Sequence, residues 1–422
     1  MPPRVASLAT VLPLRRILPV IAAFSLVAPP GPAVASPESG LRKSLSRAMR
    51  DAGGDSGAFV RDVASNKRLF AWNHTGRLIL ASNTKLFTVG AALEKHGPGG
   101  RIRTRVVAGR RIEDANGTIA GSLFLVGGGD PTFGGKRFVR DEYGGGGTVE
   151  RLADQLKAKG LRRVKGGVVG DESLFDSRRG GPTGGYSADP EVGGPLTALV
   201  FNRGLTKDGS FQGDPPSYAA DRLADALERR GIDVERSARS GRAPDDYVQV
   251  ARVHSLPMSR IAELTAEPSD NYFGEILAKG VGSGGTTRSG TRAMIRYAKR
   301  RGADGARFSD GSGLSRSNQL PPQEVVHFLD AVQDAPERDA LYEALPIAGV
   351  SGTLEDRMES GRAHANCRAK TGTLVDVSTL SGYCQSRRGR LLAFSFLMNH
   401  VSISHARSLQ DRMAQSLANY DG

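Results

Sequence analysis

The sequence of 422 residues lacks several features that mark common classes of enzyme. Two cysteines are too few for a scaffold held together by many disulfides. The seven histidines show no His-Glu-x-x-His pairing, which argues against a zinc hydrolase. No serine lies in a Gly-x-Ser-x-Gly elbow, which argues against a histidine-dependent serine hydrolase. The run Gly144 to Gly147 lacks the Lys-Ser/Thr that follows in a phosphate-binding loop. We therefore expect no metal ion and no cofactor.

Aromatic residues are also scarce, at 6%, and no nucleic-acid-binding motif is recognisable, although the net charge of +14 favours polyanionic neighbours. The basic residues are scattered and not clustered, so nucleic acid is a poor candidate partner. Anionic wall polymers or lipid headgroups at a membrane surface fit an exported protein better. The oligomeric state is left open.

Residues 1–35 have the plan of an export signal. Three arginines precede an apolar run from Ile17 to Ala28, and Ala33-Val34-Ala35 supplies the small residues of a cleavage site. The apolar run is too short for a membrane anchor. We expect cleavage after Ala35 and a location in the periplasm, cell wall or extracellular space of a bacterium. An uncleaved anchor is the alternative.

The stretch from Leu80 to Phe87 is typical of the start of a helix, and it carries Ser82 and Lys85. Positions i and i+3 share one face of a helix, so the Lys85 amine can reach the Ser82 hydroxyl and take its proton. A Ser-x-x-Lys pair alone carries little weight, because serine is a frequent helix N-cap and lysine a frequent surface charge.

Two later stretches of the sequence make the Ser-x-x-Lys pair significant. The first is Ser269-Asp270-Asn271 and the second is Lys370-Thr371-Gly372-Thr373. Ser-x-x-Lys, Ser-Asp-Asn and Lys-Thr-Gly in this chain order are the motifs of class A β-lactamases and penicillin-binding proteins. Each motif is weak by itself, but the ordered set is specific.

The two cysteines also fit a hairpin. If Val375-Asp376 is its turn, Cys367 and Cys384 lie directly opposite one another on paired strands, close enough to form a disulfide. Two small buried thiols are the alternative.

The pattern of elements predicts an α/β fold with a central antiparallel sheet flanked by helices. Strands are expected at Gly57 to Asp62 and Arg68 to Trp72, beside three strands that follow one another from Lys370 to Asn399. A last helix, from His405 to Asn419, carries a stripe of apolar residues that would pack on the sheet.

The domain plan follows from where the motifs stand. Residues 36–95 and 243–422 hold all three motifs and are predicted to form the catalytic domain, to which the chain returns from Val248. Residues 96–242 mix strands and helices, hold no catalytic motif, and are predicted to be an inserted α+β domain without a catalytic role.

The chain resembles the class C penicillin-binding proteins, which are serine-type D-alanyl-D-alanine carboxypeptidases and endopeptidases. Beyond the three motifs, the resemblance rests on segments spread over nearly the whole mature chain. These are Gly128-Gly129-Asp130-Pro131-Thr132, Gly170-Asp171-Glu172-Ser173-Leu174-Phe175-Asp176, Asp310-Gly311-Ser312-Gly313-Leu314-Ser315-Arg316 and Ser351-Gly352-Thr353-Leu354.

The resemblance implies a transpeptidase/β-lactamase-like fold and an acyl-enzyme formed on Ser82 from a peptidoglycan stem peptide or a β-lactam. Lys85 would be the base, with its pKa lowered by burial and by the Lys370 charge. Ser269 would relay a proton to the leaving amine, and Asn271 would hold Lys85 and the substrate.

The third motif would bind the substrate. Lys370, Thr371 and Thr373 would hold its terminal carboxylate, and Gly372 would allow it close to the strand. The backbone N–H groups of Ser82 and Thr373 would form the oxyanion hole.

Two alternatives stay open. One is a serine β-lactamase of the same fold, although no Glu-x-x-x-Asn loop is placed to activate the deacylating water. The other is a penicillin-sensing or wall-binding protein without turnover. The balance between carboxypeptidase and endopeptidase activity also stays open.

Overall fold

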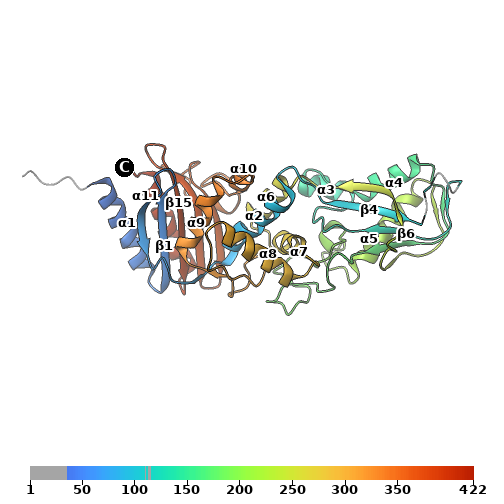
Figure 1. Ribbon diagram of the computed structural model, residues 1–422, viewed down its shortest axis with the longest axis horizontal. Coiled ribbons are helices and arrows are strands. Elements are labelled where there is room, and N and C mark those ends of the chain that lie inside the picture. The colour runs from blue at the N-terminus through green and yellow to red at the C-terminus, as the bar shows by residue number, and fades with distance from the viewer. Residues whose placement is uncertain (1–35, 110, 113–115) are drawn as a thin grey trace, which may run out of the picture. The chain divides into compact units, whose positions relative to one another are not determined.

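The computed structural model describes residues 36–109, 111–112 and 116–422. The predicted export signal and its cleavage site therefore lie outside the described residues. The described part of the chain contains two five-stranded sheets, each with its own helices (Figure 1). It is the mixed α/β fold that the sequence predicts, with an antiparallel sheet between helices.

The first sheet joins the two ends of the described chain. All its strands are antiparallel, and the N-terminal pair lies beside the last strand, as predicted. In spatial order the strands are β13 (Arg368–Leu374), β14 (Val377–Gln385), β15 (Leu391–Asn399), β1 (Asp55–Asp62) and β2 (Lys67–Trp72).

Helices cover both faces of this sheet. On one face lie α1 (Pro37–Ala52) and α11 (Ile403–Ala418), and on the other lies α9 (Pro322–Val332) (Figure 1). Successive side chains of β1 point to opposite faces of the sheet and so enter two different apolar cores. Ala58 packs with α1 and α11, whereas Phe59 packs on the α9 side.

A group of helices holds the nucleophile region. Its centre is α2, which is buried along nearly its whole length, as expected for a helix that packs against neighbours on several sides. The group consists of α2 (Thr84–His96), α6 (Met258–Ala266), α7 (Asn271–Val281), α8 (Thr287–Arg300) and α10 (Arg338–Glu343), with the short strands β3 (Leu78–Ile79) and β12 (Gln319–Leu320) paired nearby.

The second sheet lies in the segment between α2 and α6. Helices α4 and α5 pack on one of its faces around a separate apolar core. In spatial order its strands are β10 (Arg239–Ser240), β8 (Val168–Asp171), β6 (Leu123–Val126), β4 (Arg103–Ala108) and β11 (Val248–His254). The helices of this segment are α3 (Lys136–Tyr143), α4 (Val149–Ala158) and α5 (Pro215–Glu228). A separate small sheet consists of β5 (Thr118–Ile119), β7 (Arg163–Val164) and β9 (Asp233–Val234).

One boundary is later than predicted. The sequence predicts a return to the first domain from Val248, but β11 pairs with β4 and buries Ala251 and Val253 in the second core. A strand with one buried face shows its alternation in sequence but not which sheet it joins. The next helix, α6, is the first element after residue 242 that packs on α2.

The predicted hairpin register is confirmed. Leu374 lies opposite Val377 and Arg368 lies opposite Tyr383. Cys367 and Cys384 continue this register, and they are joined by a disulfide with their Cα atoms 4.2 Å apart. This disulfide ties the start of β13, the strand that carries Lys370, to β14.

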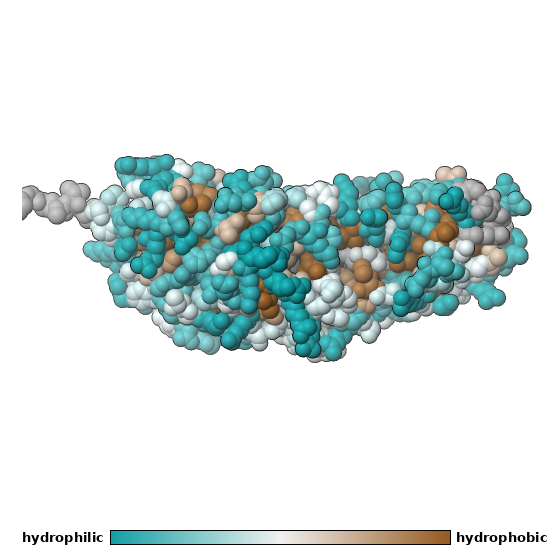
Figure 2. Space-filling view, in the orientation of Figure 1, coloured by the Kyte–Doolittle hydropathy of each residue, from teal (hydrophilic) through white to brown (hydrophobic). Residues whose placement is uncertain are grey.

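The surface of α8 is basic. Arg288, Arg292 and Arg296 are exposed at intervals of one helical turn, and Figure 2 shows strongly hydrophilic side chains gathered over this helix. Within the described residues, no helix combines the length and apolar character needed to cross a membrane.

Candidate active site

The candidate nucleophile lies in a tight turn that leads into α2. Ser82 is the middle residue of the 3₁₀ turn Ala81–Asn83, and its side chain is partly exposed. Ala81 has a φ of 46°, a left-handed conformation that is rare outside glycine and concentrates at functional sites. Thr84 Oγ1 donates to the Ala81 carbonyl at 2.8 Å and thereby fixes the turn.

The Lys85 side chain is wholly buried beneath this turn. Its Nζ lies 2.9 Å from Ser82 Oγ, 2.7 Å from Asn271 Oδ1 and 2.6 Å from the Ser312 carbonyl oxygen. Burial lowers the pKa of Lys85 to about 8, against the opposing effect of nearby acids. A neutral amine has two N–H donors, which the two carbonyl-type oxygens occupy, so its lone pair is left for the Ser82 hydroxyl.

The loop that supplies the Ser312 carbonyl is fixed by two buried carboxylates. Glu275 Oε1 accepts from the N–H groups of Gly311 and Ser312, at 3.0 and 2.8 Å. Asp310 accepts from the N–H of Gly313 at 2.8 Å. Burial raises the pKa of Glu275 to about 7, and the neighbouring Asp310 adds to this increase. The loop therefore holds the Lys85 amine by its backbone.

Glycine is required at one position of this loop. Gly313 has a φ of 93°, and a Cβ atom there would lie 2.0 Å from the Ala81 carbonyl oxygen. Any side chain would push the loop away from the nucleophile turn.

The second and third motifs meet at a second buried lysine. Lys370 Nζ donates to Ser269 Oγ at 2.8 Å and to the Thr371 carbonyl at 2.9 Å. Burial, and after it the charge of Lys85, hold the pKa of Lys370 well below its ordinary value. Ser269, like Ala81, is left-handed, with a φ of 64°. Both lysine side chains are thus buried away from water, and each amine lies next to a partly exposed hydroxyl, that of Ser82 or Ser269.

Strand β13 packs edge-on against the nucleophile turn. A Cβ atom at Gly372 would lie 2.8 Å from the Ser82 backbone nitrogen and 2.3 Å from Thr379 Oγ1, so only glycine allows this approach. The sequence-based expectation assigns the glycine to substrate approach, whereas here it is the nucleophile's own backbone that needs the space. Because β13 is the edge strand of its sheet, its outer edge is not paired with another strand of that sheet.

The threonines of the third motif have polar neighbours that the sequence does not reveal. Thr371 Oγ1 donates to Thr353 Oγ1 at 2.7 Å. Exposed Thr373 accepts a hydrogen bond from Arg407 on α11, with 3.1 Å between Nη2 and Oγ1. Arg407 is therefore an exposed cation at the end of the motif strand.

The segment predicted to have no catalytic role contacts the second motif directly. Arg203 donates to both carboxylate oxygens of Asp270, at 2.6 and 3.0 Å, and to the Gly193 carbonyl at 2.8 Å. Asn271 Nδ2 donates to the Glu191 carbonyl at 2.8 Å. Because Asn271 also accepts from Lys85, these contacts connect the segment between α2 and α6 to the amine beside Ser82.

The structure thus brings together every residue predicted for the site. Sequence reasoning misses the Ser312 carbonyl, the acid Glu275, and the arginines Arg203 and Arg407. The loop around Ser312 is visible in sequence as a glycine-rich segment, but its role is carried by backbone atoms. An isolated arginine such as Arg203 gives no sequence signal. Among the described residues, no group of three or more acidic, histidine or cysteine side chains is arranged to hold a metal ion.

The chain is similar in sequence to known carboxypeptidases. The sequence profile of the D-Ala-D-Ala carboxypeptidase 3 (S13) family matches residues 41–207 and 204–420. The D-alanyl-D-alanine carboxypeptidase of Actinomadura sp. (strain R39) is 29% identical, covering 90% of this chain and 85% of the relative. A carboxypeptidase of Mycobacterium tuberculosis is 30% identical, covering 85% of this chain and 79% of the relative.

Solved structures agree on the fold. Penicillin-binding protein 4 of Haemophilus influenzae superposes with a TM-score of 0.72 at 21% identity, covering 88% of this chain and 98% of that one. A second structure of that protein, in complex with a β-lactam, superposes with a TM-score of 0.70 at 20% identity, covering 90% and 99%.

Proposed function

Because the chain belongs to the D-Ala-D-Ala carboxypeptidase 3 (S13) family, we propose that it is a serine-type D-alanyl-D-alanine carboxypeptidase acting on peptidoglycan stem peptides. The observation that carries the proposal is the position of Lys85 Nζ, 2.9 Å from Ser82 Oγ, with its two other contacts made to oxygen acceptors. Such an amine is a base for a serine nucleophile without any histidine.

In the acylation step, Ser82 Oγ attacks the carbonyl carbon between the two terminal D-alanines while its proton passes to Lys85 Nζ. Collapse of the tetrahedral intermediate breaks the C–N bond, and Ser269 relays a proton to the departing amine of D-alanine. Water then attacks the ester, and proton return through Lys85 frees the serine. The contact between Lys370 and Ser269 supports this relay, since an amine that donates to Ser269 Oγ stabilises the oxygen when the Ser269 proton leaves.

The developing oxyanion is assigned to the backbone N–H groups of Ser82 and Thr373. The close packing of Gly372 on the Ser82 nitrogen supports this assignment, because it sets the edge of β13 beside the nucleophile turn. The start of α2 adds partial positive charge at the same point. Thr371 and Thr373 would bind the terminal carboxylate, with Lys370 below them and Arg407 as an added cation.

A β-lactam would acylate the same serine, because its strained amide takes the place of the scissile peptide. The complex of the Haemophilus relative with a β-lactam supports binding of this class of inhibitor. The proposed mode of action also implies a location outside the cytoplasm, in the periplasm or cell wall, which fits the export signal predicted for residues 1–35. Cleavage of cross-links would be a second activity of the same site, and it is measured separately on cross-linked muropeptides.

The decisive experiment combines fluorescent penicillin labelling with D-alanine release from a soluble pentapeptide. Wild-type protein should label once and release D-alanine, whereas Ser82→Ala should do neither. Ser408→Ala is the matched control, since Ser408 is exposed on α11 and its hydroxyl donates to the Ser404 carbonyl of the same helix. Penicillin label on another side chain of the wild type, or D-alanine release by Ser82→Ala, would refute the proposal.

Nitrocefin turnover distinguishes a carboxypeptidase from a β-lactamase of the same fold. A carboxypeptidase acylates stoichiometrically and hydrolyses the adduct slowly. Rapid multiple turnover of nitrocefin without D-alanine release from the pentapeptide would assign the chain to the β-lactamases.

A further inference from the structure

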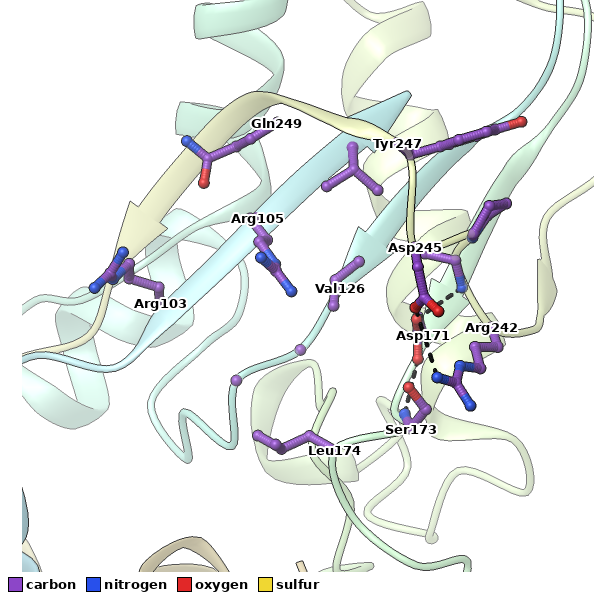
Figure 3. A pocket seen from close by; sticks show the side chains of 15 residues that line it. Arg103, Arg105, Val126, Asp171, Ser173, Leu174, Arg242, Asp245, Tyr247 and Gln249 are labelled. Carbon is purple, nitrogen blue, oxygen red and sulfur yellow. Dashed lines mark hydrogen bonds and ion pairs between the residues drawn. The ribbon is translucent and has the colours of Figure 1, made fainter. Parts of the chain in front are cut away.

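The second sheet has one face that its helices leave open. Helices α4 and α5 pack against the face that carries Val106, Leu125 and Val168. On the other face lies a cavity of about 510 Å³, lined by residues of β4, β6, β8 and β11 and by the loop before β11 (Figure 3). This volume falls within the usual range of small-ligand sites, roughly 300 to 1,000 Å³.

Arginines form one wall of this cavity. Arg103 and Arg105 are two residues apart on β4, so both side chains project from the same, open face of the sheet (Figure 3). Both are exposed, and in the described part of the chain neither guanidinium has a hydrogen-bond or ion-pair partner. Two exposed arginines two residues apart on a strand present two guanidinium groups about 7 Å apart, each able to donate two hydrogen bonds to one acidic group.

The neighbouring strand adds more positive charge. Arg252, which carries this charge, lies directly opposite Arg105. His254 lies directly opposite Arg103, and burial and the neighbouring arginines lower the pKa of its imidazole, which favours the neutral form. Like charges in directly opposed positions destabilise a sheet. The protein therefore keeps this cluster at a cost in stability that an anionic ligand would relieve.

The acids of the cavity do not neutralise this wall. Asp171 is buried and accepts from the N–H groups of Ser173 and Ala243, each at 2.8 Å. Asp245 lies 3.6 Å from Arg242 on the far side, where Figure 3 draws these contacts as dashed lines. Arg103 and Arg105 stand apart from that network.

The floor beside the arginines is apolar. Val107, Phe124 and Val169 form a small cluster, and the ring of Tyr247 packs edge-on against Phe124 with the centroids 5.5 Å apart. Tyr247 and the half-exposed Leu174 both line the cavity. The Tyr247 ring lies over Gly109, where a Cβ atom would be 3.3 Å from its Cζ, and Gly109 is about 13 Å along the strand from Arg105. A ligand that contacts both ends of the cavity therefore has several rings with apolar faces as well as an acidic group.

We propose that this cavity binds an anionic saccharide of several sugar units, with an acidic group held by Arg103 and Arg105 and another ring of the same oligomer packed against Tyr247. The assignment of the saccharide to the bacterial cell wall rests on the proposed function, whereas the binding chemistry does not. The acidic group is a carboxylate or a phosphate, both of which pair with the guanidinium fork. The site holds the enzyme on the polymer and takes no part in the cleavage.

The test titrates the purified full chain, by calorimetry at low salt, with four probes of similar length. The carboxylate probe is a peptide-free glycan oligomer of N-acetylglucosamine and N-acetylmuramic acid, and the phosphate probe is a glycosylated glycerol-phosphate oligomer. A neutral oligomer of N-acetylglucosamine tests the need for charge, and a single-stranded oligonucleotide tests the need for the saccharide.

Binding of either acidic probe, without binding of the neutral probe and with weaker binding of the oligonucleotide, supports the proposal and identifies the acid. The double substitution of Arg103 and Arg105 by alanine should weaken that binding about 100-fold, roughly tenfold for each charged contact. The control replaces Arg229 and Arg236, two exposed arginines of the same segment outside the cavity, and should bind as wild type does.

Three results would overturn the proposal: failure of both acidic probes to bind, equal loss in the control, or equal affinity for the oligonucleotide. The cavity variant should also release D-alanine from a soluble pentapeptide at the wild-type rate. Because this readout depends on Ser82 and the titration does not, a failed carboxypeptidase assignment and a failed binding site give different results.

Discussion

The active site and the open face of the second sheet both rely on positive charge, but they treat it in opposite ways. Lys85 and Lys370 are wholly buried, bonded on several sides, and lowered in pKa. Arg103 and Arg105 are exposed and have no hydrogen-bond or ion-pair partner among the described residues. A lysine can lose its proton when it is desolvated, whereas an arginine stays charged. The first arrangement thus suits proton transfer, and the second suits binding of a fixed anion.

The largest expected effect comes from breaking this distinction at Lys85. Lys85→Ala should lower kcat/KM for the pentapeptide by at least about 10³-fold, because it removes the general base. Lys85→Arg should be equally inactive, since a guanidinium cannot accept the Ser82 proton. Penicillin acylation rates measured by stopped flow would check both variants.

Lys95→Ala is the control, because Lys95 lies at the far end of α2 and donates to the Gly280 carbonyl. Substantial acylation by Lys85→Arg would show that charge alone is needed, and the contrast between the two regions would fail.

The pH profile provides the next effect. With the pKa of Lys85 at about 8, the base is protonated at lower pH, so kcat/KM should rise about tenfold per pH unit below that value and level off above it. Acylation rates from pH 5 to 10 would measure the profile. Saccharide binding at the open face should stay flat from pH 8 to 10, where the arginines remain charged. A flat acylation profile across pH 8 would contradict a lysine base.

Much of the fold and of the site is readable from sequence, because it depends on local signals. The spacing of Cys367 and Cys384 about Val375-Asp376 fixes the hairpin register, since pairing in a tight hairpin is set by its turn. The meeting of Lys85 with Ser82 follows from helical periodicity. The third motif joins them because Gly372 permits strand and turn to touch.

What could not be predicted depends on contacts between distant residues. Nothing in the local pattern of β11 indicates that it pairs with β4. Arg203 precedes Asp270 by 67 positions, and only the folded chain forms their ion pair. The carbonyl of Ser312 is a backbone atom, which no side-chain motif can reveal. The segment expected to be without a catalytic role contacts the second motif through such distant pairs.

Arg203 tests that contact with a smaller expected loss. It is a half-buried arginine that acts through Asp270 and not on substrate, so it is a positioning residue. Arg203→Ala should lower kcat about 10- to 100-fold with little change in KM, because a displaced Asn271 would no longer hold Lys85 in place. Arg203→Lys should recover part of the loss, since one of the two hydrogen bonds can form again.

Arg222→Ala is the matched control, because Arg222 pairs with Asp225 within α5. Circular dichroism melts would separate unfolding from misplacement. If Arg203→Ala melts as wild type does and keeps full kcat, the second sheet segment has no influence on the motif.

The smallest effect is expected at Arg407, which is exposed like the arginines of the open face but lies at the active site like the two lysines. Like Arg103, it is exposed, but it bonds to Thr373 beside the nucleophile. If it attracts the terminal carboxylate without taking part in the chemistry, Arg407→Ala should raise KM about three- to tenfold and leave kcat unchanged. Arg412→Ala, on the same helix and equally exposed, controls for loss of one charge. A fall in kcat with constant KM would instead place Arg407 among the groups that stabilise the transition state, and exposure would no longer separate binding cations from catalytic ones.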